Sequence, residues 1–223
     1  MSRPRALVAW SSGKDSAWAL HEVRRAGALD VVGLLTTVTS EFGRVSMHAV
    51  REALLDLQAE SLRLPCRKVR IPWPCPNERY EAEMAAALAE ARAAGVTRIV
   101  FGDLFLEDVR SYRVEKLAGT GIDPVFPLWG RDTARLAREM IAGGLRATLT
   151  CVDPRQLDPS FAGRAFDAAL LDGLPPGVDP CGERGEFHTF CWTGPMFARP
   201  IAVANGEIVT REGFVFADLR SRP

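Results

Sequence analysis

The stretch that decides the fold is Ala6-Leu7-Val8-Ala9-Trp10-Ser11-Ser12-Gly13-Lys14-Asp15-Ser16, close to the start of the chain. Its first five residues form an apolar run that predicts a buried strand. Apolar side chains then recur at helical spacing from 16 to 26, and Gly27 is a typical helix end. A strand, a short Ser-Gly loop and a helix therefore follow one another without a break.

This alternation of strand and helix continues along the chain. Apolar runs predict strands, amphipathic runs predict helices, and Asn77 is expected to cap a helix. The expected strands are 31–38, 67–73, 98–104, 123–129 and 147–152, and the expected helices are 46–62, 77–95 and 133–142. Continuous apolar strands separated by helices imply a parallel sheet with helices on both faces, so we predict a Rossmann-like α/β fold.

The pattern changes after about residue 130. Residues 153–185 are rich in Pro, Gly and Asp around one expected short helix at 164–171. The tail predicts a hairpin of 196–204 and 207–217 that turns at Asn205-Gly206, a frequent two-residue turn. We therefore expect a nucleotide-binding domain at 1–130 and a small C-terminal α+β domain at 131–223.

The bulk composition excludes several classes of protein. Acidic and basic residues balance at 28 each among 223 residues, so a general electrostatic grip on nucleic acid or anionic membrane is not indicated. No apolar run reaches the roughly 18 residues of a membrane span. The five cysteines include no CxxC pair, which disfavours structural zinc. We expect a cytoplasmic protein and leave a homodimer open.

The loop at 11–16 has the properties of a phosphate cradle. Ligands of a parallel sheet bind beyond the carboxyl ends of its strands, and the first N–H groups of a helix are unpaired. Gly13 allows close approach, Lys14 offers charge, and Asp15 fits a Mg²⁺ ion beside the phosphates. The plain alternative is a loop that only caps the helix. The predicted phosphate-binding residues are Ser11, Ser12, Gly13, Lys14, Asp15 and Ser16.

Two further groups lie near the ends of expected strands. Gly102-Asp103 follows a strand and could serve metal, ribose or substrate, although the sequence after it also fits a solvated helix face. Thr36 lies in the second expected strand, and His48 follows that strand. We assign both to the nucleotide pocket, with a solvent-facing His48 as the alternative.

The segment 179–189 is the densest set of reactive groups. It contains Cys181, Glu183, Glu186 and His188, with glycines that favour a tight loop. Glu186 and His188 fall on one side of an extended segment, where they could hold an ammonium group or move a proton. The alternative is a polar turn before a strand.

These motifs together resemble a known family. The string SSGKDS is similar to the SGGxDS loop of PP-loop ATP pyrophosphatases, with Ser12 where glycine is usual. In order with it come Gly102-Asp103, Arg113-Val114-Glu115, 127–132 (PLWGRD) and 182–189 (GERGEFHT), and this series resembles the diphthine–ammonia ligase family.

The resemblance implies a HUP-type fold, ATP and Mg²⁺ as cofactors, and a reaction. ATP would adenylylate a carboxylate, pyrophosphate would leave, and ammonia would attack the acyl-adenylate to give an amide. In the family the acceptor is the diphthine side chain of translation elongation factor 2. The Ala- and Arg-rich composition hints at a bacterial source, in which the acceptor would be another carboxylate, such as a small metabolite.

Residue roles are carried over by motif. The implied catalytic residues are Lys14, Asp15, Asp103, Glu183, Glu186 and His188. The implied substrate-binding residues are Arg113, Glu115, Glu183, Gly185, Glu186, His188 and Thr189. Two departures stand out: Arg184 replaces a glycine that the family often has, and Lys116-Leu117-Ala118 lacks the cysteine commonly found there.

Two other functions remain as alternatives. One is a PP-loop tRNA-modifying enzyme, which would usually need paired catalytic cysteines or a basic RNA-binding extension. The other is an ATP-binding regulator without turnover. Asp15 and the many reactive side chains of the 179–189 segment disfavour it. An AMP-forming amide ligase is the leading interpretation.

Overall fold

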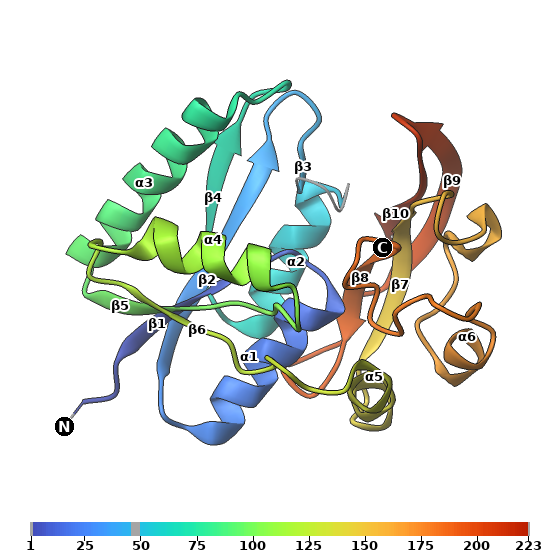
Figure 1. Ribbon diagram of the computed structural model, residues 1–223, viewed down its shortest axis with the longest axis horizontal. Coiled ribbons are helices and arrows are strands. Elements are labelled where there is room, and N and C mark those ends of the chain that lie inside the picture. Colours follow the sequence, from blue (N-terminus) through green and yellow to red (C-terminus); the bar gives the residue numbers. More distant parts are fainter. Residues whose placement is uncertain (1, 46–49, 223) are drawn as a thin grey trace.

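The computed structural model describes residues 2–45 and 50–222, which form two β-sheets with helices between and beside them (Figure 1). Sheet A has the order β3-β2-β1-β5-β6, with β4 paired to β2. All of its pairings are parallel except that of β3. Its strands are β1 (Arg5–Ala9), β2 (Asp30–Thr39), β3 (Arg44–Val45), β4 (Cys66–Ile71), β5 (Val96–Val100) and β6 (Asp123–Val125).

Helices cover both faces of sheet A, which confirms the predicted Rossmann-like α/β fold. One face carries α1 (Lys14–Ala26) and α2 (Glu52–Leu62), and the other carries α3 (Asn77–Ala93) and α4 (Glu107–Leu117) (Figure 1). Two hydrophobic clusters match these faces, one with the buried side chains of α1 and α2, the other with those of α3 and α4. The sheet strands are buried on both sides, as their continuous apolar runs require.

The C-terminal part forms the antiparallel sheet B, of order β8-β7-β10-β9. Its elements are α5 (Thr133–Ala142), β7 (Arg146–Val152), a short 3-10 turn (Pro159–Phe161), α6 (Ala168–Asp172), β8 (Phe187–Thr193), β9 (Val203–Arg211) and β10 (Phe214–Ser221). This sheet lies beside α1 and α2 (Figure 1). One core cluster contains Trp18 and Leu54 together with Phe187 and Leu219, so the two halves share a continuous core. The domain boundary near residue 130 stays a prediction.

The C-terminal hairpin turns at a different place from the one predicted. Its two-residue turn is Glu212-Gly213, with φ of 50° and 81°, and Asn205 lies within the β9–β10 ladder opposite Leu219. The Asn205 side chain donates to the Gly163 carbonyl oxygen at 2.9 Å. Asn-Gly is a strong local turn signal, but this tertiary bond and the strand pairing override it.

Several element ends also differ from the predictions. The helix expected at 164–171 begins only at Ala168, because Asp167 caps it by accepting from Leu170 N at 2.8 Å, while Ala165 pairs with Thr148 as a bridge. Asn77 is the first residue of α3 rather than its cap, a position that Pro76 occupies. Within the described residues, α2 starts at Glu52, and no helix there is long and apolar enough to span a membrane.

Candidate functional site

The loop at 11–16 leaves the carboxyl end of β1 and enters α1. Ser16 Oγ donates to the Gly13 carbonyl oxygen at 3.0 Å and lies 3.2 Å from Ser11 Oγ, while Gly13 N donates to Ser11 Oγ at 3.3 Å. Ser12 has a φ of 70°, in the left-handed region that favours glycine, and is fully buried. The Ser11 and Ser16 hydroxyls therefore hold the shape of the loop.

A buried amide fixes this loop from the side of α2. Gln58 Nε2 donates to the carbonyl oxygens of Ser12 (3.0 Å) and Cys191 (2.6 Å), and its Oε1 accepts from Trp10 Nε1 at 2.9 Å. Cys191 N also donates to Ser12 O at 2.9 Å. Sequence reasoning missed Gln58; its only signal was an amide at a core position of an amphipathic helix.

Lys14 points into the protein. Its side chain is 2% exposed, and its ammonium group donates to an Asp15 carboxylate oxygen at 2.8 Å and to the Cys181 carbonyl oxygen. It lies over the rings of Phe166 and Phe187, at 5.5 and 5.4 Å. Burial lowers the pKa of Lys14, but the charge and hydrogen bond of Asp15, together with the charges of Cys181 and Glu183, raise that pKa above its ordinary value. Lys14 thus ties the loop to the segment 179–189.

Asp15 retains one unused oxygen. Oδ2 is bonded to Lys14, whereas Oδ1 is buried and has no hydrogen-bond partner among the described residues. Burial raises the pKa of Asp15, against the opposing effect of Lys14. An unpartnered carboxylate oxygen at the start of α1 would fit a Mg²⁺ ion that draws its other ligands from phosphates and water. No cluster of three or more metal-binding side chains exists in the part of the chain that the structure describes.

The end of β5 packs against this loop. A Cβ on Gly102 would lie 2.8 Å from the backbone of Asp15 and Ser16, so only glycine fits there. Next to it, both carboxylate oxygens of Asp103 accept from Arg113, at 2.5 and 3.0 Å. The Arg113 guanidinium also stacks 4.4 Å from the centre of the Phe101 ring. Asp103 and Arg113 therefore form one oriented unit at the carboxyl edge of sheet A.

Two carboxylates shape the segment 179–189 internally. Glu186 is 2% exposed, and its two oxygens accept from the backbone N of Asp179 (2.8 Å) and Arg184 (3.0 Å). Asp179 Oδ2 in turn accepts from the backbone N of Cys181 and Glu183, at 3.1 and 3.0 Å. Both carboxylate oxygens of Glu186 are thus used to hold the loop. The sequence predicted that Glu186 contacts the substrate, and these bonds favour a structural role instead.

The Cys181 thiol, which the sequence left open, is also used internally. Its Sγ donates to the Thr133 carbonyl oxygen at 3.5 Å, and burial raises its pKa. A thiol without thiolate character is a poor nucleophile or metal ligand. Cys181 contributes to the site through its carbonyl oxygen rather than its sulfur.

Glu183 is the carboxylate of this segment that reaches the N-terminal half of the chain. Its Oε1 accepts from Leu104 N at 2.7 Å, just after Asp103. Burial raises the pKa of Glu183 to about 7, and the charges of Asp15 and Asp103 add to that rise. A carboxyl group with this pKa can exchange a proton near neutral pH.

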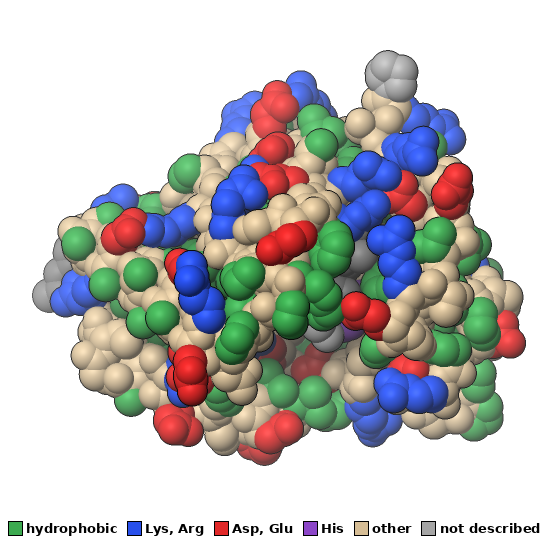
Figure 2. All heavy atoms as spheres, turned by 90° about the horizontal axis from the view of Figure 1, so that it is seen from above, with side chains coloured by type: hydrophobic (Ala, Val, Ile, Leu, Met, Phe, Trp, Pro, Cys, Tyr) green, Lys and Arg blue, Asp and Glu red, His purple; other side chains and the backbone are tan. Residues whose placement is uncertain are grey.

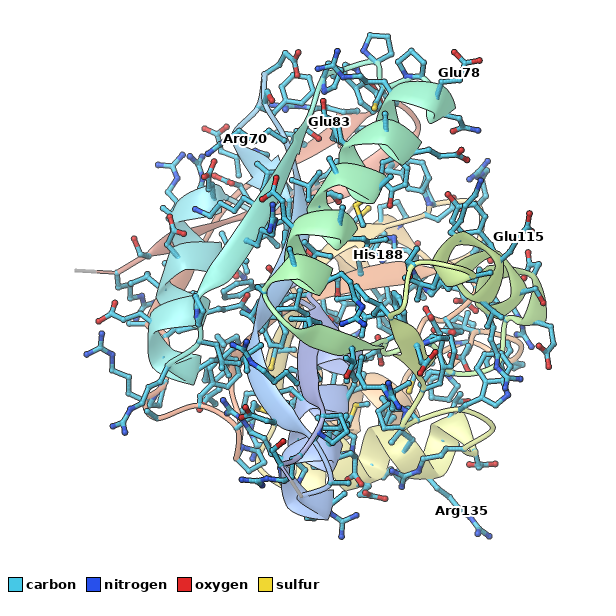
Figure 3. The ribbon with its side chains drawn as sticks, turned by 90° about the vertical axis from the view of Figure 1, so that its left-hand side faces the viewer. Arg70, Glu78, Glu83, Glu115, Arg135 and His188 are labelled. Carbon is cyan, nitrogen blue, oxygen red and sulfur yellow. The ribbon has the colours of Figure 1, made fainter. Side chains whose placement is uncertain are left out.

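Strand β8 brings the last predicted residues to the loop. Thr189 Oγ1 accepts from Lys14 N at 3.1 Å, and burial, with a smaller effect of Lys14, lowers the pKa of His188 to about 4. Gly185 takes a φ of 86°. Figure 3 shows His188 near the middle of the molecule and Glu115 at the outer side of α4, where it is exposed. The structure does not bring Glu115 to the other site residues.

A cavity of about 850 Å³ opens between α3 and α4 over sheet A. Ser11 and Thr36 line it, with Tyr80, Tyr112 and Arg113 from the two helices. The Thr36 hydroxyl also donates to the Trp10 carbonyl oxygen. Its size and mostly apolar lining suit a nucleoside. His48, also predicted for this pocket, lies outside the described residues. Figure 2, which views the molecule from the top of Figure 1, shows the surface hollowed near the centre of the view.

Fold and loop together define a Rossmann-like α/β protein with a Ser-Gly loop at the carboxyl end of its first strand. The chain belongs to the diphthamide synthase family, because sequence models of the N-terminal and C-terminal domains of diphthamide synthase match residues 4–121 and 132–221.

Curated relatives agree with this assignment. Proteins named diphthine–ammonia ligase from Bos taurus and Rattus norvegicus are 28% and 34% identical, with 96% of this chain and 88% of theirs covered. A Schizosaccharomyces pombe protein of that name is 25% identical over 89% of this chain and 36% of its own length. The predicted family is confirmed.

Proposed function

We propose that this protein is an ATP-dependent, AMP-forming amide ligase, which adenylylates a carboxylate and then amidates it with ammonia. The main support is that Ser11 belongs both to the loop at 11–16 and to the lining of the cavity of about 850 Å³. The same loop carries the unpartnered Asp15 Oδ1. A triphosphate and its nucleoside can thus be held at once. The relatives' name, diphthine–ammonia ligase, supports the same reaction.

The phosphates would bind to the N–H groups at the start of α1 and to the hydroxyls of Ser11 and Ser16, since a helix N-terminus favours anions. The adenosine would lie in the cavity beside Thr36 and Tyr80. A bound Mg²⁺, held by Asp15 Oδ1, would offset the charge of the phosphates. Lys14 positions Asp15 rather than the phosphates, because its ammonium group is already bonded on the protein side.

Glu183 would take a proton from the incoming ammonium. It is anchored at the end of β5 by Leu104 N, and its pKa of about 7 allows it to accept a proton at physiological pH. Ammonia would then attack the acyl carbon, and AMP would leave. Asp179 and Glu186 hold the loop that carries Glu183, while Gly185, His188 and Thr189 would border the acceptor.

The acceptor would be a diphthine-type carboxylate, as in the relatives' name. Purified protein with ATP, Mg²⁺, ammonium and diphthine-bearing elongation factor 2 should yield AMP, pyrophosphate and amide. Asp15→Asn should reduce turnover at least 100-fold, because the Mg²⁺ ligand is lost, whereas Asp56→Asn, at an exposed position of α2, should not. Formation of ADP and phosphate, or tight ATP binding without turnover, would refute the proposal.

A further inference from the structure

Two large aromatic side chains are exposed at the carboxyl edge of sheet A. Phe42, in the turn between β2 and β3, is 54% exposed, and Trp73, just after β4, is 49% exposed. Their ring centroids are 6.2 Å apart at an angle of 57°. The turns meet because β2 and β4 are neighbouring strands, with Ser40 N donating to Ile71 O at 2.9 Å. Single exposed apolar side chains are common, but adjoining ones form an apolar patch of the kind that marks interaction sites.

Arg44, two residues after Phe42, belongs to a group of three arginines that share a single carboxylate. Asp218 on β10 accepts from Arg44 at 3.0 Å, from Arg51 at 2.9 and 2.7 Å, and lies 3.4 Å from Arg220. Asp218 is 11% exposed, whereas the arginines are 23%, 42% and 61% exposed, so the outer surface is guanidinium. The cluster therefore retains positive charge, even when Glu41 on the neighbouring turn is counted.

This cluster joins the two halves of the molecule beside the candidate site. Arg44 and Arg51 come from the β2–β3–α2 region, and Asp218 and Arg220 come from sheet B. Figure 2 shows Lys and Arg side chains gathered beside the central hollow, over the junction of the two halves. Figure 3 places the labelled Arg70 of β4 at the same edge of sheet A.

We propose that Phe42, Trp73, Arg44, Arg51 and Arg220 form a docking surface for an acidic segment of the protein that carries the acceptor carboxylate. This inference rests on the proposed function. Trp and Arg dominate the energetics of protein interfaces, and guanidinium groups pair with carboxylates in a fixed geometry. Exposed aromatics give the contact an apolar centre, and the arginines select negative charge.

The same features fit RNA less well. A bound strand needs a row of free cations along its phosphates, and parallel platforms on which bases stack. Here the arginines converge on one carboxylate, Arg70 pairs with Glu52 at 2.7 Å, and the two rings are inclined to each other. The charge pattern is compact, as for a short acidic segment, rather than extended.

The test separates docking from chemistry. Equilibrium binding of purified, diphthine-bearing elongation factor 2 to the full chain is measured by titration calorimetry, without ATP. Trp73→Ser and Arg220→Glu should each weaken binding at least tenfold. The matched controls Ile208→Ser on β9 and Arg138→Glu on α5, both highly exposed, should bind as the parent does. Circular dichroism and thermal unfolding verify that all four variants fold.

Turnover gives the second readout. Trp73→Ser and Arg220→Glu should raise KM for the protein acceptor at least tenfold, with kcat, KM for ATP and KM for a short synthetic diphthine peptide unchanged. Docking is refuted if the factor does not bind, if the two variants bind like the controls, or if poly(U) RNA binds this surface in preference. Turnover of neither acceptor refutes the proposed function, and the binding data still decide the docking proposal.

Discussion

The two faces of sheet A are covered in opposite ways. On one face, α1 and α2 are sealed by sheet B, and the side chains form one continuous core with it. On the other face, α3 and α4 leave between them the cavity of about 850 Å³. The loop at 11–16 lies at the boundary, since Gln58 and β8 fix it from the packed face and Ser11 opens to the cavity.

The packed face therefore positions the loop at 11–16, whereas the open face offers space to bind a ligand. The packed face holds the backbone of the loop at 11–16 and the Lys14 side chain in one geometry. Catalysis by orientation requires such a fixed geometry. The open face provides volume for a ligand without disturbing that geometry. Substitutions on the packed face should therefore change stability and turnover together, whereas those on the open face should change ligand affinity alone. The four predictions below test this contrast, in order of decreasing effect.

The largest effect is expected for Lys14→Met, on the packed face. The change leaves the Asp15 charge without its partner beside the Cys181 carbonyl oxygen, and breaking a buried pair typically costs about 3–5 kcal/mol. Urea unfolding should show this loss, and turnover should fall with it. Lys14→Met combined with Asp15→Asn should recover part of the stability. The exposed Lys116→Met is the control, and a loss below about 1 kcal/mol for Lys14→Met would contradict the contrast.

Glu183→Gln should stabilise the protein at alkaline pH while reducing turnover. The folded-state pKa of about 7 lies above the ordinary value of 4.5, so the folded state binds the proton more tightly, and stability falls as pH rises between these values. A pKa difference of one corresponds to about 1.4 kcal/mol, and partial exposure reduces the effect, so we expect a gain of about 2 kcal/mol at pH 8.

Urea unfolding of parent and Glu183→Gln from pH 4 to 8 in metal-free buffer tests this. Glutamine keeps an oxygen that can accept from Leu104 N. The two stability curves should meet near pH 4 and separate toward pH 8. Parallel curves would show that Glu183 titrates normally and would remove it as the proton acceptor.

On the open face, Ala85→Trp should block the cavity. Ala85 is an exposed residue of α3 that lines the space between the helices, so an indole there would occupy the volume of the nucleoside. Calorimetry should show ATP affinity reduced at least tenfold, with stability changed by less than about 0.5 kcal/mol. Ala86→Trp, exposed on the same helix but outside the cavity lining, should bind ATP normally. Unchanged ATP affinity in Ala85→Trp would place the nucleoside elsewhere.

The smallest effect is expected for Ser12→Gly in the loop. Glycine adopts the left-handed φ of 70° without the steric cost that a Cβ brings, so thermal unfolding should show a gain of about 0.5–1 kcal/mol. Ser11→Gly, at a position that is not left-handed, should be destabilising instead. A stability loss in Ser12→Gly would contradict this expectation, because the buried Ser12 hydroxyl has no hydrogen-bond partner among the described residues.

Local pattern predicted much of this architecture. The strands β1, β2 and β4, the helix α5 and the loop at 11–16 follow from apolar spacing and from Gly and Ser at fixed places, whereas the short β3 was not predicted. Asn205-Gly206 failed because its local turn preference competes with the β9–β10 pairing. The inward direction of Lys14 also could not be predicted, since its partners Cys181 and Phe187 are more than 160 residues away.

By itself, the sequence determined the fold class and the family and predicted a phosphate-type loop, because each rests on short motifs whose residues are close together along the chain. Only the tertiary structure decided which groups the loop uses. In the structure, Glu186 holds the 179–189 loop and Asp15 Oδ1 has no partner among the described residues. Glu183 accepts from Leu104 N, and a cavity lies on one face of sheet A. These outcomes depend on burial and on contacts between segments that are distant in the sequence. Burial and such contacts set pKa values and hydrogen-bond partners, and a local sequence pattern does not contain them.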